Sequence, residues 1–246
     1  MNVIKLGGSL LDDAQRRADA LAQIAAAWHG GEEVVLVHGG GKHIDAMLAK
    51  LGIAKKTHAG LRITDDATLD VVVSVLGGLV NKLLVSELTA LRIRAAGISG
   101  SDAGTLVAEQ HPPIDGVELG HVGRVVGSNP RLIRSMLAGG ILPVISSLAQ
   151  SESGQLFNVN ADSAAAALAV SLQAENLRFI TDVAGLLDAS GNVVPLLHAS
   201  TAEEFLGSST VSGGMRPKLE AALHALRSGV HSIAIGEDGG TVLVAA

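Results

Sequence analysis

Residues Val34–Asp45 read VVLVHGGGKHID and carry the clearest signal of the fold. An apolar, β-branched run ends at His38, three glycines follow, and a helical pattern begins near residue 41. A buried strand that turns through glycines into a helix is the repeating unit of parallel α/β sheets, and its turn lies where such sheets bind ligands. The segment therefore predicts an α/β fold with an anion-binding turn, although it matches neither GxGxxG nor GxxxxGK[ST].

The strand-to-helix pattern repeats along the rest of the chain. Buried strands are predicted at 2–6, 33–38, 141–146, 177–181 and 231–235, and helical patterns fall at about 41–51, 66–91, 129–138, 161–173 and 214–228. Between the first two strands, Ala14, Ala18, Leu21 and Ala25 recur at helical spacing. Strands that alternate with helices indicate a mainly parallel sheet that is covered on both faces.

The predicted helix over 66–91 is the longest in the chain. Its apolar residues keep one stripe, and Gly77-Gly78 interrupts the pattern, which suggests close packing or a kink. The polar segments RITDD (62–66) and ELGHVGRVVG (118–127) are expected as hairpins beside the main sheet. A weak boundary near 173–176 divides the single domain 1–246 into an N-lobe, 1–173, and a C-lobe, 174–246, on one continuous sheet.

The composition argues against several classes of function. The chain has 246 residues and a net charge of −6, with no dense run of Lys or Arg that would suggest a nucleic-acid or membrane face. It has no cysteine, which excludes disulfides, thiolate metal sites and a thiol nucleophile. The start, MNVIKLGGSL, lacks the layout of a signal peptide, and no uninterrupted apolar run reaches membrane-spanning length. We therefore expect a soluble cytoplasmic protein.

Three glycine clusters are candidates for anion binding, namely KLGGSL, HGGGK and SGGMRPK. Glycine lets backbone N–H groups approach phosphate oxygens that a Cβ would block. Lys5 lies inside an apolar strand next to the first cluster, so its ammonium group must reach solvent or an anion. Lys218 lies near the positive end of the last helix, where a bound polyphosphate would stabilise it. The alternative for each lysine is an ordinary solvated side chain.

Other polar residues form a second group of candidates. Asn158, Asn160 and Asp162 alternate at the start of an alanine-rich helix, so an extended backbone would place them on one side. Asp162 could instead be the N-terminal cap of that helix or an acidic residue of its first turn. Arg62 could hold a carboxylate through two parallel hydrogen bonds, or could form a surface salt bridge.

The remaining motifs argue against other chemistries. His38, His58 and His121 match no metal motif in their spacing, and we expect turn and packing roles for them. A dinucleotide-binding oxidoreductase is excluded, because the chain has no GxGxxG with a downstream acidic residue. Aromatic residues make up 2% of the chain, which weighs against stacking of nucleic-acid bases.

Eight segments together resemble the amino acid kinase family over essentially the whole chain. In order, they are IKLGGSLL, VLVHGGGK, GLRITD, NKLLVSEL, ELGHVGRV, FNVNADSAAAALA, TDVAGLLD and SGGMRPK. Within the family, the chain is most similar to the kinases of N-acetyl-L-glutamate, because it keeps both the third glycine of HGGG and the N-x-N-A-D stretch. Lys42 departs from the family pattern, in which proline or another uncharged residue is frequent.

The resemblance implies a three-layer αβα sandwich, the amino acid kinase fold, and ATP-dependent phosphorylation of the side-chain carboxylate of N-acetyl-L-glutamate. The acceptor would bind the N-lobe and ATP the C-lobe, with Mg²⁺ held mainly by phosphates and water and with no protein ligand named for the metal. Lys5 and Lys218 would flank the transferred phosphoryl group, and Asp162 would orient both lysines. The residues implied for the acceptor are Gly40, Gly41, Arg62, Asn158 and Asn160. Those implied for the phosphates and nucleotide are Gly7, Gly8, Asp182, Val183, Ala184, Gly185, Leu186, Leu187, Thr210, Val211, Ser212, Gly214 and Met215.

The resemblance also bears on assembly. Arginine-inhibited relatives carry an additional N-terminal helix that interlaces dimers into a hexamer, whereas this chain starts at its first strand. We therefore expect a homodimer that is insensitive to arginine, with the 66–91 helix in the interface. Neither a nucleic-acid partner nor a membrane partner is expected.

Two alternatives stay open. The first keeps the enzyme class and changes the acceptor to an aminoadipate derivative or another N-acyl amino acid, since one methylene in a pocket discriminates by only about 1–3 kcal/mol. The second is a catalytically silent small-molecule binding or regulatory protein on the same fold. Its signature would be the loss of Lys5, Lys218 or Asp162, and all three residues are present.

Overall fold

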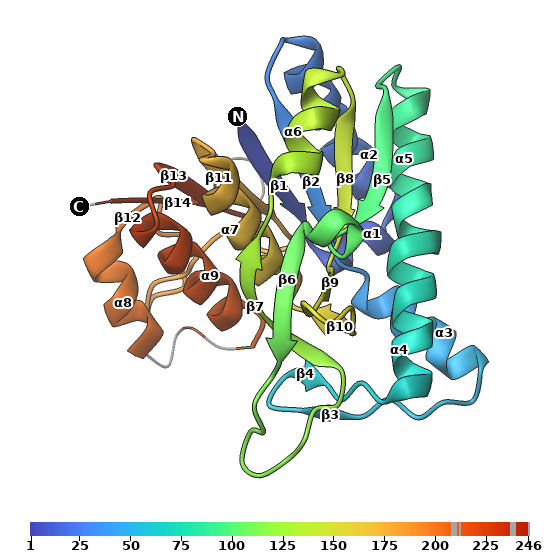
Figure 1. The fold of residues 1–246 in the computed structure, drawn as a ribbon. Coiled ribbons are helices and arrows are strands. Elements are labelled where there is room, and N and C mark those ends of the chain that lie inside the picture. The colour runs from blue at the N-terminus through green and yellow to red at the C-terminus, as the bar shows by residue number, and fades with distance from the viewer. Residues whose placement is uncertain (208–210, 212, 237–239, 246) are drawn as a thin grey trace.

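The computed structural model describes residues 1–207, 211, 213–236 and 240–245, and an eight-stranded sheet forms its centre (Figure 1). In spatial order, the strands are β12 (Leu196–His198), β14 (Thr241–Val244), β13 (Ser232–Ile235), β11 (Asn176–Ile180), β1 (Asn2–Leu6), β2 (Val34–His38), β8 (Leu142–Ser146) and β5 (Ala95–Ser99). Neighbouring strands are parallel throughout, except for the antiparallel pair of β13 and β14. The predicted mainly parallel sheet is therefore confirmed.

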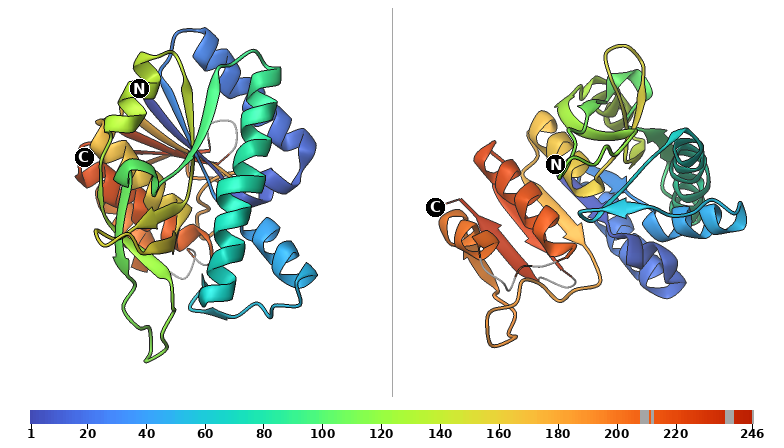
Figure 2. Two further views of the ribbon diagram at one scale, coloured as in Figure 1. Left: turned by 45° about the vertical axis from the view of Figure 1, so that its right-hand side comes forward. Right: turned by 90° about the horizontal axis from the view of Figure 1, so that it is seen from below.

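Helices cover both faces of this sheet, which gives the three layers that the family resemblance implies (Figures 1 and 2). One face carries α1 (Gly8–Asp12), α2 (Ala14–His29), α3 (Gly41–Lys50), α4 (Asp66–Val73) and α5 (Asn81–Ala90). The other carries α6 (Arg131–Ala138), α7 (Ala161–Leu172), α8 (Ala199–Gly207) and α9 (Met215–Arg227). Strand residues alternate between the two cores: Val3 packs with the second group of helices, and Ile4 packs with the first. Lys5 therefore faces the side of α7.

The longest helix runs without a break from Asp66 to Ala90, because a π-helical segment, η1 (Ser74–Val80), joins α4 to α5. Gly77-Gly78 lies within this segment, and a Cβ added at Gly78 would meet no atom within 4 Å. Of the two expectations, close packing is therefore not seen at Gly78, and the glycines accompany a π-helical segment, which is one of the usual causes of a kink.

By length and composition alone, Asp66–Ala90 is the one helix among the described residues that could cross a membrane. Asn81-Lys82 interrupts the apolar run in the sequence, but the helix continues through both residues. Val72, Leu76 and Val80 along it are no more than 1% exposed. A core helix of a soluble protein passes the same test.

A second, smaller sheet and a hairpin lie beyond the ends of β2 and β8 (Figure 1). The strands of the small sheet close on themselves: they are β6 (Leu106–Gln110), β7 (Val122–Ser128), β9 (Leu148–Gln150) and β10 (Leu156–Val159). The hairpin consists of β3 (Thr57–His58) and β4 (Leu61–Arg62). RITDD thus begins in a hairpin as predicted, whereas ELGHVGRVVG contributes β7, which pairs with β6 and β10 instead of folding back on itself. An isolated bridge between Thr64 and Gly120 joins the two units.

The helix predicted after the first strand is present, but its buried face differs from the predicted one. Ala14 and Ala18 are exposed in α2, while Ala20, Leu21, Ile24 and Ala25 are buried with Arg17. The Arg17 guanidinium pairs with Glu87 of α5 at 2.8 Å, which turns this face of the helix towards its neighbour. Alanine patterns carry little information about the face, because alanine is tolerated on both sides of a helix.

Candidate active site

Two lysines and one aspartate from three different elements meet at the carboxyl end of the central sheet. Lys5 Nζ lies 2.8 Å from Asp162 Oδ1, and Lys218 Nζ lies 3.2 Å from both carboxylate oxygens. The three residues are between 5% and 7% exposed. Lysine side chains are rarely buried to this extent unless they are paired, so the shared carboxylate explains why both are tolerated here.

Charge is the dominant property of this cluster. Burial alone would raise the pKa of Asp162, but the two ammonium groups outweigh it and hold the pKa of this carboxyl below its usual range. Burial lowers the pKa of Lys218, and repulsion from Lys5 adds to this effect while Asp162 opposes it. Lys218 Nζ also lies 5.3 Å from the centre of the Phe179 ring, a cation–π distance. With all three groups ionised, two positive charges against one negative leave a net +1 that can receive an anion.

Asn160, and not Asp162, caps helix α7. The Asn160 side-chain oxygen accepts hydrogen bonds from the N–H groups of Asp162 and Ser163 at 2.8 and 3.1 Å. The alternative role of Asp162 as the N-cap is therefore wrong, since it sits in the first turn with its carboxylate on the lysines. The alternation of Asn158, Asn160 and Asp162 expected of an extended backbone ends at Asn160, because the helix starts at residue 161.

A pocket of about 340 Å³ opens beside the lysine pair. All the residues predicted to hold the acceptor line it, namely Gly40, Gly41, Arg62, Asn158 and Asn160. Lys5, Gly8 and Asp162 line it as well. A larger cavity, of about 550 Å³, lies between β7, α7 and α9 and shares Leu61, Val122 and Asn160 with this pocket. We place the chemistry in the smaller pocket, because it contains the buried charges.

Arg62 is held against the glycine turn by a residue that the sequence pattern did not single out. Its Nη1 lies 2.5 Å from Asp45 Oδ1, and its Nη2 donates to the carbonyl oxygen of Gly41 at 3.1 Å. Burial alone would raise the pKa of Asp45, but hydrogen bonds from Lys55 and Arg62 bring it below its usual range. Asp45 follows Gly41 by one helical turn in α3, and this spacing is the only sequence signal that could have identified it.

The glycines of HGGG serve different purposes. A Cβ on Gly40 would lie 2.8 Å from Leu76 Cδ2, so this glycine is required by packing against η1 and not only by access to oxygens. A Cβ on Gly41 would meet nothing within 4 Å, and that residue faces open space in the pocket. The ammonium group of Lys42 points elsewhere: its side chain is 67% exposed and pairs with Asp12 at 3.3 Å.

The residues predicted for the nucleotide follow the carboxyl end of β11 and precede α9. Asp182, Val183, Ala184 and Leu187 are exposed after β11, Gly214 is exposed at the start of α9, and Met215 is half-buried. Gly7 donates its N–H to Ile180 O at 2.7 Å, next to Gly8. Thr210 and Ser212 lie outside the described residues.

Three of the residues predicted for the nucleotide are held by contacts with the protein itself. Leu186 is 1% exposed and its N–H donates to Thr241 Oγ1 at 2.8 Å, so its side chain packs in the core. Val211 is 5% exposed and packs in the same core. Gly185 is buried at φ 153°, and a Cβ there would lie 2.8 Å from Thr241 Oγ1. The side chains of Leu186 and Val211 thus anchor their segments in the core, and a contact of these residues with the nucleotide stays a prediction.

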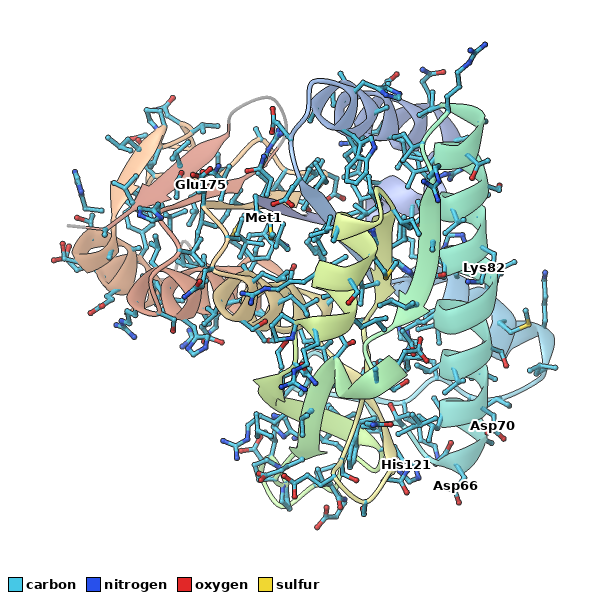
Figure 3. The ribbon with its side chains drawn as sticks, turned by 45° about the horizontal axis from the view of Figure 1, so that its top comes forward. Met1, Asp66, Asp70, Lys82, His121 and Glu175 are labelled. Atoms are coloured by element: carbon cyan, nitrogen blue, oxygen red, sulfur yellow. The ribbon has the colours of Figure 1, made fainter. Side chains whose placement is uncertain are left out.

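His58 and His121, for which turn and packing roles are expected, each lie beside an aspartate. His58 Nε2 lies 3.4 Å from Asp115 Oδ2, and His121 Nε2 lies 2.6 Å from Asp66 Oδ1 at the start of α4 (Figure 3). In the part of the chain that the structure describes, no group of three His, Cys, Asp or Glu residues could hold a metal ion.

The fold and the site together define a class of protein. A parallel α/β sheet carries, at its carboxyl edge, two buried ammonium groups on one carboxylate and a glycine turn beside an arginine-lined pocket, which is an arrangement suited to bringing two anions together. Residues 1–237 match the amino acid kinase family, and the chain belongs to that family.

Individual relatives agree with this assignment. The chain is 44% identical to the acetylglutamate kinase of Solibacter usitatus, over 95% of this chain and 89% of that protein. It is 40% identical to the acetylglutamate kinase of Ruegeria pomeroyi, over 95% of this chain and 80% of that protein. The crystal structure of smu.665 from Streptococcus mutans UA159 has a TM-score of 0.88 at 30% identity, and covers 99% of this chain and 98% of that chain.

Proposed function

We propose that this enzyme uses ATP to phosphorylate the side-chain carboxylate of N-acetyl-L-glutamate, which gives N-acetyl-L-glutamyl 5-phosphate on the route to arginine. Relatives named acetylglutamate kinase match almost the whole chain at 40–44% identity. The observation that carries the proposal within this structure is the Lys5–Asp162–Lys218 cluster at the wall of a pocket that also holds Arg62.

The chemistry requires charge control rather than proton transfer. A glutamate side chain has a pKa of about 4.3 in model peptides, so the acceptor carboxylate is already a nucleophile at pH 7. One of its oxygens forms a bond to the γ-phosphorus of ATP, the bond to the bridging β–γ oxygen breaks, and ADP leaves with that electron pair. No proton moves, so no general base is needed. The barrier comes from bringing anions together and from charge on the moving phosphoryl group.

Lys5 and Lys218 supply the positive charge in this mechanism. Lys5 projects from β1 and lines the acceptor pocket, which places it on the acceptor side. Lys218 projects from α9, and the N-terminus of this helix follows a segment predicted to bind the nucleotide. Asp162 holds both ammonium groups and thereby fixes their positions before substrates bind. Preorganised charges of this kind stabilise a transition state without reorganising during the reaction.

ATP is the expected phosphoryl donor of a kinase in this family, and we propose Mg²⁺ as its counterion. In this proposal the ion arrives on the nucleotide and keeps phosphate and water ligands. When bound, Mg²⁺ would neutralise charge on the phosphates. We assign it no protein ligand.

The proposed reaction is tested by incubating the protein with MgATP and a panel of acceptors, and by trapping any acyl phosphate with hydroxylamine. The panel contains N-acetyl-L-glutamate, N-acetyl-L-aspartate, N-acetyl-L-aminoadipate and free L-glutamate. We expect the largest kcat/KM for hydroxamate formation with N-acetyl-L-glutamate. Preference for the aminoadipate derivative would support the alternative acceptor, and no hydroxamate from N-acetyl-L-glutamate would refute the proposal.

Arg62→Ala is expected to raise KM for the acceptor by about tenfold or more, because it removes a charge-assisted hydrogen bond of about 1.5–3 kcal/mol. The value of kcat should change less, since Arg62 lies on the acceptor side of the pocket. Initial rates at varied N-acetyl-L-glutamate and saturating ATP measure the effect. Arg94→Ala, which removes an exposed arginine bonded to Gly139 O, is the matched control. An unchanged acceptor KM would assign Arg62 to the Asp45 salt bridge alone.

We propose a cytoplasmic homodimer as the working form of the enzyme. The helix Asp66–Ala90 packs one face in the core, and Leu79 near its middle is 53% exposed on the outer face. Pairing of this helix with a second copy would cover that side chain.

A further inference from the structure

His38 is a buried titratable residue to which the proposed phosphoryl transfer assigns no role. It is the last residue of β2, is fully buried, and directly precedes the three glycines of the acceptor pocket. Burial lowers its pKa to about 4, and the charge of nearby Lys82 acts in the same direction. His38 is therefore a neutral imidazole at physiological pH, and the position of its single proton depends on its two neighbours.

Lys82 determines the orientation of the Asn81 amide (Lys82 is labelled in Figure 3). Its ammonium group, which can only donate, lies 3.0 Å from one end of that amide and 3.1 Å from the carbonyl oxygen of Gly97. The end of the amide that faces Lys82 must be the oxygen, so the nitrogen faces the interior. Gly97 makes room for this arrangement, because a Cβ there would lie 1.7 Å from Asn81 Oδ1.

The Asn81 amide in turn determines the tautomer of His38. Asn81 Nδ2 lies 3.0 Å from His38 Nε2, 3.0 Å from the carbonyl oxygen of Val144 and 3.3 Å from that of Ile98. Since an amide nitrogen can only donate, Nε2 must accept and carries no proton. The proton is then on Nδ1, which lies 2.9 Å from the carbonyl oxygen of Gly39 and donates to it.

A fixed Gly39 carbonyl has a consequence for catalysis. In a trans peptide, C=O and the following N–H point in opposite directions, so the His38 hydrogen bond also fixes the direction of the Gly40 N–H. The Gly39 oxygen faces the buried imidazole, and Gly39, Gly40 and Gly41 line the acceptor pocket. We infer that His38, Asn81 and Lys82 are positioning residues that aim the Gly40 N–H at the acceptor. This inference rests on the proposed function.

The tautomer is tested directly by NMR of the wild-type protein with ¹⁵N-labelled histidine. The His38 signals are identified by their absence from His38→Asn. We expect a protonated Nδ1 and an unprotonated Nε2 from pH 6 to pH 9, with no titration in that range. A protonated Nε2, or an ordinary histidine titration, would overturn the inference whether or not the protein proves to be a kinase.

The catalytic consequence is tested by two substitutions at the same position. His38→Leu removes the donor, and we expect kcat/KM for the acceptor to fall by about 100-fold, the effect of a misplacement of about 1 Å. KM for ATP should stay within about twofold of wild type, because the nucleotide lies across the cleft. His38→Asn offers an amide N–H close to the position of Nδ1, and is expected to recover at least about tenfold of the loss.

A control separates positioning from a general loss of stability. Thr105→Val removes another fully buried hydrogen-bonding group, which donates to Asp102 O at 2.7 Å far along the chain from the glycine turn. It should lower stability and leave the acceptor KM unchanged. Suppose that the wild-type protein phosphorylates the acceptor and that His38→Leu is as active as Thr105→Val. The positioning role is then refuted, while the proposed function stands. If His38→Leu does not fold, the NMR assignment of the His38 tautomer in the wild-type protein decides whether the inference stands.

Discussion

Lys218→Met is expected to fold normally and to lose about 10²–10³ in kcat. Removing one well-aimed donor from a transition state typically has an effect of that size. Folding should survive, because Asp162 keeps its 2.8 Å ion pair with Lys5 and the methionine side chain can pack on Phe179. Burial already lowers the pKa of Lys218, so an apolar side chain of similar length relieves a desolvation penalty. The charge of the cluster falls from +1 to zero, and ATP should therefore bind more weakly.

The measurements are steady-state kcat, the ATP dissociation constant and the urea midpoint of the same preparation. Arg227→Met is the matched control, because it removes a positive charge from the far end of the same helix, where Arg227 is exposed and pairs with Glu203. It should leave kcat unchanged. A Lys218→Met enzyme with near-wild-type kcat would remove Lys218 from the phosphoryl site, and an unfolded one would give the residue a structural role.

The strands that the sequence could predict are those that are buried on both faces. NVIKL, VVLVH and LPVIS read as continuous apolar runs because helices cover them on both sides, and each lies within about one residue of its predicted ends. The edge strand β5 reads AAGIS and is half-buried throughout, so it carries no such signal. The small sheet could not be predicted in full for two other reasons. Its strand β9 has only three residues, and the sheet closes through pairings between segments that are distant in the sequence.

The sequence could predict those site residues whose charge is unfavourable in its local setting. Lys5 within an apolar strand and Lys218 near a helix N-terminus are improbable without a partner, and that improbability is visible in the sequence. The link from His38 to Asn81 is not visible there, because it joins residues 43 positions apart and depends on the path of η1. An asparagine before a helix suits both an N-cap and a ligand contact. The sequence alone therefore did not show that Asn160 caps α7.

Asp162→Asn is expected to abolish turnover and to destabilise the protein, in contrast to Lys218→Met. The substitution preserves shape, but it removes the carboxylate that pairs with both buried ammonium groups and raises the charge of the three-residue cluster from +1 to +2. Breaking a buried ion pair in this way costs about 3–5 kcal/mol of unfolding free energy. Because binding of ATP brings negative charge to the cluster, the nucleotide should bind at least as tightly as in wild type and should raise the thermal midpoint by more. Only kcat should collapse.

The pH dependence of stability separates this charge effect from a change in packing. The folded-state pKa of Asp162 is depressed, so its contribution to stability is fully present above the unfolded value of about 3.9 and is lost as pH falls below it. Asp162→Asn should therefore cost most stability at neutral pH, and its unfolding free energy should converge towards that of wild type in acid. Urea unfolding at pH 7 and at the lowest pH where both proteins fold measures the difference. A destabilisation independent of pH would mean that the carboxylate charge does not hold the two lysines, and wild-type kcat at pH 7 would mean that they need no such partner.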